Sequence, residues 1–289
     1  MVLRAPDITE FVARAGAAVL VRVTAALGST PRERGAYMLV AADDVAGTIG
    51  GGQLEYMAID TARQMLRQNK AHEKLDVPLG PEIGQCCGGR VQIALERLDD
   101  ELLVTLLDEC QAARAAEPSV ILFGAGHVGR ALALALAPLP YQTTLVDTRA
   151  EMLEGLPEAI AVQASALPEA AVRAARPGSA FVVLTHDHAL DFLIMREVLL
   201  RGDAAYAGMI GSKSKRAQFR HWFIAEGGDA AQLGGLICPI GSQGLGDKRP
   251  EIIASLVCAE IIAKFALRDC ADGAESAKLI SVMGAVHGG

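Results

Sequence analysis

The chain has 289 residues, enough for two domains that each bury a core of their own. It carries 27 Lys and Arg against 34 Asp and Glu, a formal net charge of −7. An acidic chain without a long basic run makes nucleic acid an unexpected partner, because contacts to phosphates need a positively charged face. The apolar run 131–146 contains Pro138 and Pro140 and is shorter than the roughly 20 residues that span a bilayer, so we expect no membrane segment.

The first sixteen residues, MVLRAPDITEFVARAG, are typical of a short helix and lack the apolar core and cleavage site of a signal peptide. Six cysteines in a chain with such a start are typical of reduced thiols. We therefore expect a cytoplasmic protein.

The first half of the chain alternates strands, helices and glycine-rich turns. Runs of β-branched residues predict strands, and apolar residues at helical spacing predict helices. In chain order we expect a strand at 17–27, a loop at 28–34, a strand at 35–41, a helix that begins after 47–52 and ends near 69, strands at 72–79 and 90–98, and a helix at 100–116. This order is typical of a small α+β domain, 1–117, that ends at Glu117-Pro118.

The second half has a different rhythm, in which buried strands alternate with helices. Strands are predicted at 119–123, 141–147, 180–186 and 204–212, and helices follow the first, third and fourth of them. Such alternation favours a Rossmann-like domain with a parallel, doubly wound sheet at 118–246. For 247–289 we expect a helix at 249–267 that packs on the N-terminal domain, followed by a partly ordered tail.

A dinucleotide fingerprint, Gly124-Ala125-Gly126-His127-Val128-Gly129, lies between a predicted strand and a helix. Asp147 ends the next strand, where an acidic residue binds ribose hydroxyls in nucleotide-binding folds. Two interpretations stay open: Gly124, Gly126 and Gly129 approach a nucleotide, or they serve the packing of strand against helix. The imidazole of His127 would restrict a dinucleotide or contact another ligand.

Two further segments lie at predicted strand ends of the second domain. His186 and His188, in Thr185-His186-Asp187-His188, either line a pocket or belong to a turn in which Asp187 or His188 caps the next helix. Ser212 and Lys213, in GSKSKR, either bind a phosphate at a helix N-terminus or form an ordinary cap with a solvated basic turn.

Three successive glycines, Gly50, Gly51 and Gly52, precede Gln53 and Glu55 in the first domain. Because glycines cost conformational entropy, a strict backbone requirement explains the run better than a flexible loop. Gln53 and Glu55 at the helix start would then face the same ligand. In the preceding loop, Ser29-Thr30-Pro31-Arg32 would supply hydroxyls and a guanidinium for an anion, or form a plain turn.

Cys86 and Cys87 stand between glycines in Gly84-Gln85-Cys86-Cys87-Gly88-Gly89. The segment has too few apolar residues to bury two thiols, and sulfur is a ligand for soft metals and sulfur-bearing cofactors. A turn with two small residues or a vicinal disulfide is the structural alternative. Both cysteines are candidate ligands for a metal-containing cofactor.

Together these motifs resemble the XdhC/CoxI family. They are GSTPRERGAYMLV, GTIGGGQLE, GQCCGG, ILFGAGHVGRAL, THDH, YAGMIGSKSKR and GDKRPEIIASLVCAE, in this order along nearly the whole chain. The resemblance implies an N-terminal XdhC/CoxI domain and a C-terminal Rossmann domain. It also implies an accessory protein that binds the molybdenum cofactor, molybdopterin with its metal, as cargo.

The same resemblance implies the partners of the chain. A cysteine desulfurase would supply the sulfido ligand of the cargo, and the apoenzyme of xanthine dehydrogenase or a related molybdenum hydroxylase would receive it. We also expect a homodimer and, since no residues obvious for acid–base or nucleophilic turnover are found, a chaperone rather than an enzyme. The alternatives are an NAD(P)-dependent oxidoreductase with a nucleotide in the Rossmann crevice and a sulfurtransferase that uses Cys86 or Cys87.

Overall fold

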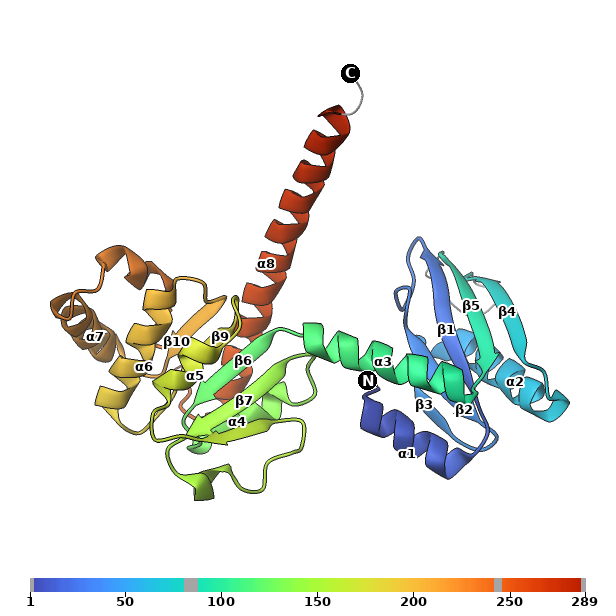
Figure 1. The fold of residues 1–289 in the computed structure, drawn as a ribbon, viewed down its shortest axis with the longest axis horizontal. Coiled ribbons are helices and arrows are strands. Elements are labelled where there is room, and N and C mark those ends of the chain that lie inside the picture. Colours follow the sequence, from blue (N-terminus) through green and yellow to red (C-terminus); the bar gives the residue numbers. More distant parts are fainter. Residues whose placement is uncertain (1–2, 81–87, 242–245, 287–289) are drawn as a thin grey trace. The chain divides into compact units, whose positions relative to one another are not determined.

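The fold consists of two units, Met1–Ala116 and Glu117–Gly289, each with a sheet of its own (Figure 1). The structure, a computed structural model, describes residues 3–80, 88–241 and 246–286, and side chains as far as Arg268. An antiparallel sheet followed by a parallel one confirms the predicted α/β class, with an α+β unit before a Rossmann-like unit. In these residues no helix combines the length and apolar content that a bilayer crossing requires.

The first unit is built on a five-stranded sheet in the order β3-β2-β1-β5-β4, in which every pairing is antiparallel. The strands are β1 (Ala18–Leu27), β2 (Tyr37–Ala41), β3 (Val45–Gly47), β4 (His72–Pro78) and β5 (Arg90–Arg97). β3 was not predicted, because three residues are too few to show an alternating pattern.

Alternation along β1 gives this sheet two buried faces. Val19 and Val21 belong to the core that includes helix α2 (Gly52–Gln68). Leu20 belongs to the core on the opposite face, with α1 (Ala5–Ala15) and α3 (Asp100–Ala116). Because α2 packs on one face of the sheet, the glycine run 50–52 at its start lies at that face.

The second unit contains a six-stranded parallel sheet in the order β11-β10-β9-β6-β7-β8. The strands are β6 (Ser119–Phe123), β7 (Gln142–Asp147), β8 (Ala161–Ala164), β9 (Ala180–Val183), β10 (Tyr206–Met209) and β11 (Leu236–Ile237). The chain reverses its direction of travel between β6 and β9, which is the topological switch point where open α/β sheets bind ligands.

Helices cover both faces of the parallel sheet. Val120 and Leu122 of β6 pack in a core with α4 (His127–Leu136) and α8 (Pro250–Val286). Ile121 and Phe123 pack on the other face, in a core with α5 (Glu169–Ala174), α6 (His188–Arg201) and α7 (Lys213–Ala225). The short 3-10 helices η2 (Ala150–Leu153) and η3 (Ala230–Gly235) lie in connections.

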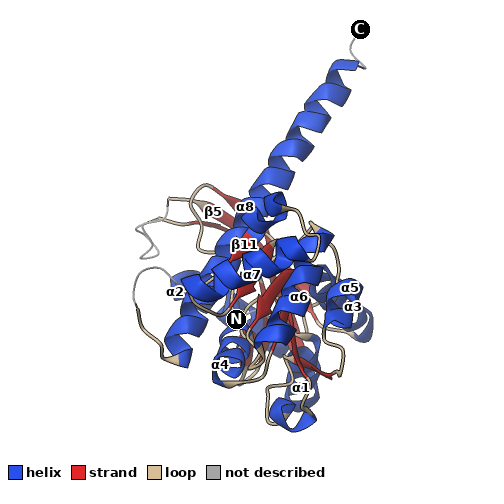
Figure 2. Cartoon of the chain, turned by 90° about the vertical axis from the view of Figure 1, so that its left-hand side faces the viewer, coloured by secondary structure: helices blue, strands red, loops and turns tan. Residues whose placement is uncertain are grey.

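The helix α8 differs from the expectation in its packing and its length. It is one continuous helix in Figure 2 and ends at Val286 rather than near 267. Its buried residues Ala254, Val257, Ile261 and Phe265 belong to the core of the second unit, not to a core of the N-terminal domain as predicted. An apolar stripe shows that a helix buries a face, but it does not identify the surface that covers it.

Adjacent isoleucines of α8 test this packing. Ile261 is 0% exposed in the second core, whereas its neighbour Ile262 is 42% exposed. We expect Ile261→Ala to lower the free energy of unfolding by about 3 kcal/mol, because it leaves a cavity, and Ile262→Ala to lower it by less than about 1 kcal/mol. Urea unfolding followed by the fluorescence of Trp222, which lies in the same unit, measures both; equal effects would contradict the packing.

Candidate functional site

Three loops that the sequence singled out meet at one end of the antiparallel sheet in the first unit. Leu27 at the end of β1 pairs with Arg90 at the start of β5. Met38 in β2 pairs with Gly47 at the end of β3. The loop 28–34, the glycine run 50–52 and the connection from β4 to β5 therefore lie at the same end.

The loop 28–34 touches the base of the β4–β5 connection. A Cβ added to Gly89 would lie 2.3 Å from the carbonyl oxygen of Ser29, so only glycine lets the two backbones approach this closely. The base itself is closed by two hydrogen bonds: Leu79 N donates to Gly89 O at 2.8 Å, and Gly88 N donates to Leu79 O at 2.9 Å. Both ends of the connection are thus held beside Ser29.

The glycine run touches the same loop. Gly50 has φ +127°, in the region that favours glycine, and a Cβ there would lie 2.8 Å from Pro31 Cβ. The requirement for glycine at Gly50 is therefore steric as well as conformational. Pro31 and the exposed Arg32 in this way border the start of α2.

Glu55 holds the glycine run in shape from the first turn of α2. Its Oε2 accepts hydrogen bonds from Thr48 Oγ1 at 2.5 Å, from Ile49 N at 3.1 Å and from Gly51 N at 3.1 Å. Thr48 Oγ1 in turn accepts from Gly50 N at 3.1 Å. This carboxylate oxygen is used by the loop's own backbone, so Glu55 positions the loop, whereas the sequence had suggested that it faces a ligand.

The other predicted residues of this site differ in what surrounds them. Gln53 and Gly52 are exposed at the start of α2, and a Cβ at Gly51 would meet no atom within 4 Å, so the backbone is open to a ligand there. Cys86 and Cys87 lie outside the described residues. The N–H groups of Ile49, Gly50 and Gly51 are used within the loop, so the exposed helix start at Gly52 and Gln53 is the part left for an anionic group. The exposed cations Arg32 and Arg34 would favour such a group, whereas the exposed Glu33 between them would oppose it.

In the second unit, the fingerprint glycines serve packing at two of three positions. A Cβ at Gly124 would lie 2.5 Å from Leu184 O, and one at Gly129 would lie 1.8 Å from Gly124 O. A Cβ at Gly126 would meet nothing within 4 Å. Gly124 and Gly129 are thus explained by the turn from β6 to α4, and Gly126 alone is open to a ligand.

Asp147 is occupied by its own surroundings. It is 5% exposed and accepts hydrogen bonds from Ala125 N at 2.7 Å, Arg149 N at 3.0 Å and the Arg149 side chain at 3.0 and 3.1 Å. Burial by itself would raise the pKa of Asp147, but the Arg149 side chain and the two backbone N–H groups outweigh it, and the pKa lies below its ordinary value. In this state the carboxylate is committed to the protein rather than offered to a ribose.

The crevice at the switch point is small. A cavity of about 10 Å³, bordered by Gly124, Asp147, Thr185 and His186 among others, lies between the ends of β6, β7 and β9. That volume holds about one water molecule. His186 reaches this cavity from an exposed position, and His127 is exposed at the first position of α4.

The segment 185–188 is held by a buried ion pair that the sequence did not reveal. Asp191, 0% exposed, accepts hydrogen bonds from Thr185 N at 3.0 Å and Thr185 Oγ1 at 2.6 Å, and it pairs with Lys215. Asp187 caps α6 by accepting from Ala189 N at 2.8 Å. The pair joins the strand end to α6 and α7.

Ser212 and Lys213 have different roles in the structure. Ser212 is the N-cap of α7 and accepts from Lys215 N at 3.2 Å, which matches the capping interpretation. Lys213 is exposed and borders a larger cavity along α7, described below. The structure therefore does not gather these two side chains around one phosphate-sized space.

Three residues with clear roles were missed from the sequence: Arg149, Asp191 and Lys215. The first lies two positions after Asp147, a spacing that could have suggested a local ion pair. Asp191 and Lys215 are 24 positions apart on two helices, and no local pattern links them. Among the described residues, no group of three or more His, Cys, Asp and Glu side chains is arranged to hold a metal ion.

Removal of the Glu55 carboxylate tests its positioning role. We expect Glu55→Ala to destabilise the loop by about 2 kcal/mol, because three donors lose their acceptor, and to speed amide exchange of Ile49 and Gly51 by about tenfold or more. Gln53→Ala, an exposed change in the same helical turn, is the control and should leave both amides unaffected. Hydrogen exchange measures the effect; unchanged protection in Glu55→Ala would contradict the role.

The depressed pKa of Asp147 predicts a pH-dependent effect. A carboxylate whose folded-state pKa is lowered stabilises the fold above its unfolded pKa of about 4, and this contribution is lost as the pH falls through the folded-state pKa. Asp147→Asn should therefore destabilise the chain by about 2 kcal/mol at pH 7, with a difference that shrinks below pH about 4. Urea unfolding of both proteins across this range measures it.

A matched control is available for this experiment. Asp247 pairs with Arg249 in the same two-residue spacing, but Asp247 is only half-buried and Arg249 is exposed. Asp247→Asn should have a smaller effect at pH 7, because solvent reaches Arg249 and screens this pair more than the pair of the buried Asp147. A pH-independent loss in Asp147→Asn would contradict the assignment.

Comparison with known proteins identifies relatives of both units. Residues 120–261 match the XdhC Rossmann domain, and residues 11–76 match the XdhC and CoxI family. The Escherichia coli (strain K12) protein YqeB, described as uncharacterized, is 30% identical over an alignment of 246 residues, and the match covers 81% of this chain. The chain spans 41% of the length of YqeB.

Among solved structures, one described as a xanthine dehydrogenase from Bacillus halodurans superposes with a TM-score of 0.75. The match covers 92% of this chain and 97% of that one at 19% sequence identity, so the likeness concerns the fold. The two domain matches account for well over half of the sequence and occur in the order that the motifs predicted. The chain belongs to the XdhC and CoxI family.

Proposed function

We propose that this chain binds the molybdenum cofactor as cargo and delivers it to the apoenzyme of xanthine dehydrogenase or a related molybdenum hydroxylase. Membership of the XdhC and CoxI family supports a role in the maturation of xanthine dehydrogenase. The solved structure with the same fold is described as a xanthine dehydrogenase, which agrees with this context. The cargo and its transfer are the parts that we add.

One observation carries the proposal: the meeting of three glycine-containing loops in the first unit. Ser29 O lies against Gly89, and Pro31 lies against Gly50, so two of the loops border the base of the third. That third connection carries Cys86 and Cys87 in sequence. Three segments that are 20 to 60 positions apart thus share one end of the sheet.

The chemistry of this end suits the proposed cargo. Molybdopterin carries a dithiolene, a metal and a phosphate, and thiolates are ligands for soft metals. Cys86 or Cys87 would approach the molybdenum. The helix start at Gly52 and Gln53 and the exposed Arg32 would face the phosphate, because backbone N–H groups and guanidinium favour anions.

The partners complete the proposal. While the cargo is bound, a cysteine desulfurase would supply its terminal sulfido ligand, and the chain would act as a homodimer in the cytoplasm. The protein itself would perform no turnover: it would shield the cofactor from water and oxygen and release it to the apoenzyme.

The Rossmann unit gives less support to an oxidoreductase. Among the described residues, Asp147 is engaged by Ala125 and Arg149, and the crevice beside Gly124 has a volume of about 10 Å³. A dinucleotide would need the Asp147–Arg149 pair to open and the crevice to widen. A nucleotide at Gly126 therefore remains a secondary proposal.

Cysteine variants test the carrier role. We expect Cys86→Ala or Cys87→Ala to reduce molybdenum and pterin bound per chain by about tenfold or more, because a soft ligand is lost. Binding is measured on protein purified from cells that make the cofactor, by metal analysis and by pterin fluorescence. Delivery is measured as xanthine dehydrogenase activity after addition of the loaded chain to apoenzyme.

The control is a third thiol of the same unit. Cys110 is half-buried, with its Sγ 3.0 Å from Tyr37 Oη, and lies on α3. Cys110→Ala should keep the bound cofactor. Full cofactor content and delivery in both Cys86→Ala and Cys87→Ala would reject the thiol assignment, and wild-type protein that neither carries nor delivers molybdenum cofactor would reject the carrier role.

A further inference from the structure

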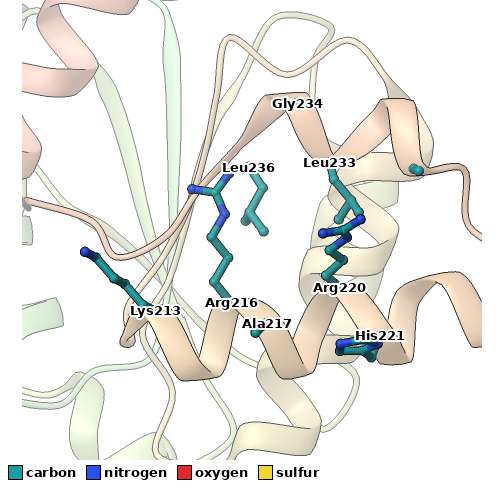
Figure 3. A pocket seen from close by; sticks show the side chains of 9 residues that line it. Lys213, Arg216, Ala217, Arg220, His221, Leu233, Gly234 and Leu236 are labelled. Atoms are coloured by element: carbon teal, nitrogen blue, oxygen red, sulfur yellow. The ribbon is translucent and has the colours of Figure 1, made fainter.

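A cavity of about 460 Å³ lies along helix α7 in the second unit, away from the crevice at the switch point. Helix α7 forms one wall and the segment from η3 to β11 forms the other (Figure 3). The residues that border it are Lys213, Arg216, Ala217, Arg220, His221, Ala230, Leu233, Gly234 and Leu236. A volume in this range is typical of a site for a small molecule.

The wall on α7 is cationic. Lys213, Arg216 and Arg220 are spaced three and four positions apart, so they share one face of the helix. In Figure 3, the side chains of Arg216 and Arg220 rise from α7 toward the segment with Leu233 and Leu236. No carboxylate is among the residues that border the cavity.

These cations are not used by the ion pairs of the described structure. Within the described ranges, the ion pair formed by α7 is that of Lys215 with Asp191, on the buried side of the helix. Arg216 Nη1 donates to the carbonyl oxygen of Cys238 at 3.4 Å, which steadies its guanidinium without neutralising it. In a chain of net charge −7, this concentration of positive charge is local.

The rest of the border is largely apolar. Leu236 is 3% exposed and Leu233 is half-buried, and Ala217 and Ala230 complete this surface. A cavity with three cations on one side and aliphatic carbon on the other fits a ligand with an anionic end and an apolar body.

We propose that this cavity binds a small organic phosphate monoester. Two guanidiniums one helical turn apart would hold the phosphate, since the arginine fork matches phosphate oxygens in pairs, and Lys213 would add charge. The body of the ligand would lie against Leu233 and Leu236. This site is separate from the proposed cargo site in the first unit, and its existence does not depend on the carrier function.

A phosphate monoester fits better than an acidic segment of another protein. The cationic side chains lie along one helix beside a hollow bordered by nine residues, a short stretch compared with the extended groove that binds a peptide. The leucines and alanines of the border would also gain little from contact with the charged Asp and Glu side chains of such a peptide. Binding of an acidic peptide is accordingly one of the outcomes of the test.

The experiment is calorimetric titration of the full chain with phenyl phosphate, inorganic phosphate and phenol. We expect saturable 1:1 binding of phenyl phosphate with Kd below about 1 mM, weaker binding of inorganic phosphate, and no saturation by phenol. Arg216→Ala and Arg220→Ala should each weaken phenyl phosphate at least about tenfold, because each removes charge-assisted hydrogen bonds. Fluorescence of Trp222, next to His221 on α7, gives a second readout.

Two controls separate this site from others. Arg173→Ala removes a cation of the same unit that pairs with Glu197, and it should leave the affinity unchanged. His186→Ala alters the crevice at the switch point and should also leave it unchanged. Arg220→Ala changes an exposed residue, so its thermal unfolding should match that of the wild type and keep the comparison interpretable.

Several results would overturn the proposal. These are the absence of saturation by phenyl phosphate, equal binding of phenol, unchanged affinity in Arg216→Ala and Arg220→Ala, or loss of affinity in His186→Ala alone. Binding of a hexaglutamate peptide with no binding of phenyl phosphate would also reject it, and would assign the cavity to a protein partner instead.

Discussion

A glycine turn keeps one shape only if its backbone N–H groups find acceptors, and in both units a nearby carboxylate supplies them. Glu55 binds the N–H groups of Ile49 and Gly51, and Asp147 binds that of Ala125. These carboxylates would be costly to leave without partners, because both are withdrawn from solvent to some degree. The two glycine turns lie beside the candidate ligand sites. Their shape therefore depends on the carboxylates of Glu55 and Asp147.

This dependence explains why the strands were easier to predict than the roles of the acids. Alternation in 17–27 and the buried runs at 119–123 and 180–183 reflect burial, which acts on each residue separately. A carboxylate beside glycines looks the same in sequence whether it binds ribose or its own backbone. The predicted packing of α8 was wrong for a related reason. Its apolar stripe fits any apolar surface, and the sequence does not identify the surface that it covers.

In the second unit, the cavity at the switch point is smaller than the cavity beside α7. The strand order and the turn at Gly124 are those of a dinucleotide-binding fold, yet the crevice is about 10 Å³ and Asp147 is bound by Arg149. The larger cavity lies beside α7, on the edge of the sheet that carries β11. The fold alone therefore does not identify where this unit would bind a ligand, as is general for α/β proteins.

The base of the β4–β5 connection has a consequence for how this family can diversify. The hydrogen bonds between Leu79 and Gly88 and between Leu79 and Gly89 use main-chain atoms alone. Side chains farther out in that connection are therefore not needed to fix the register of the two strands. Evolution can therefore change the residues of that connection, or lengthen it, without rebuilding the sheet beneath it.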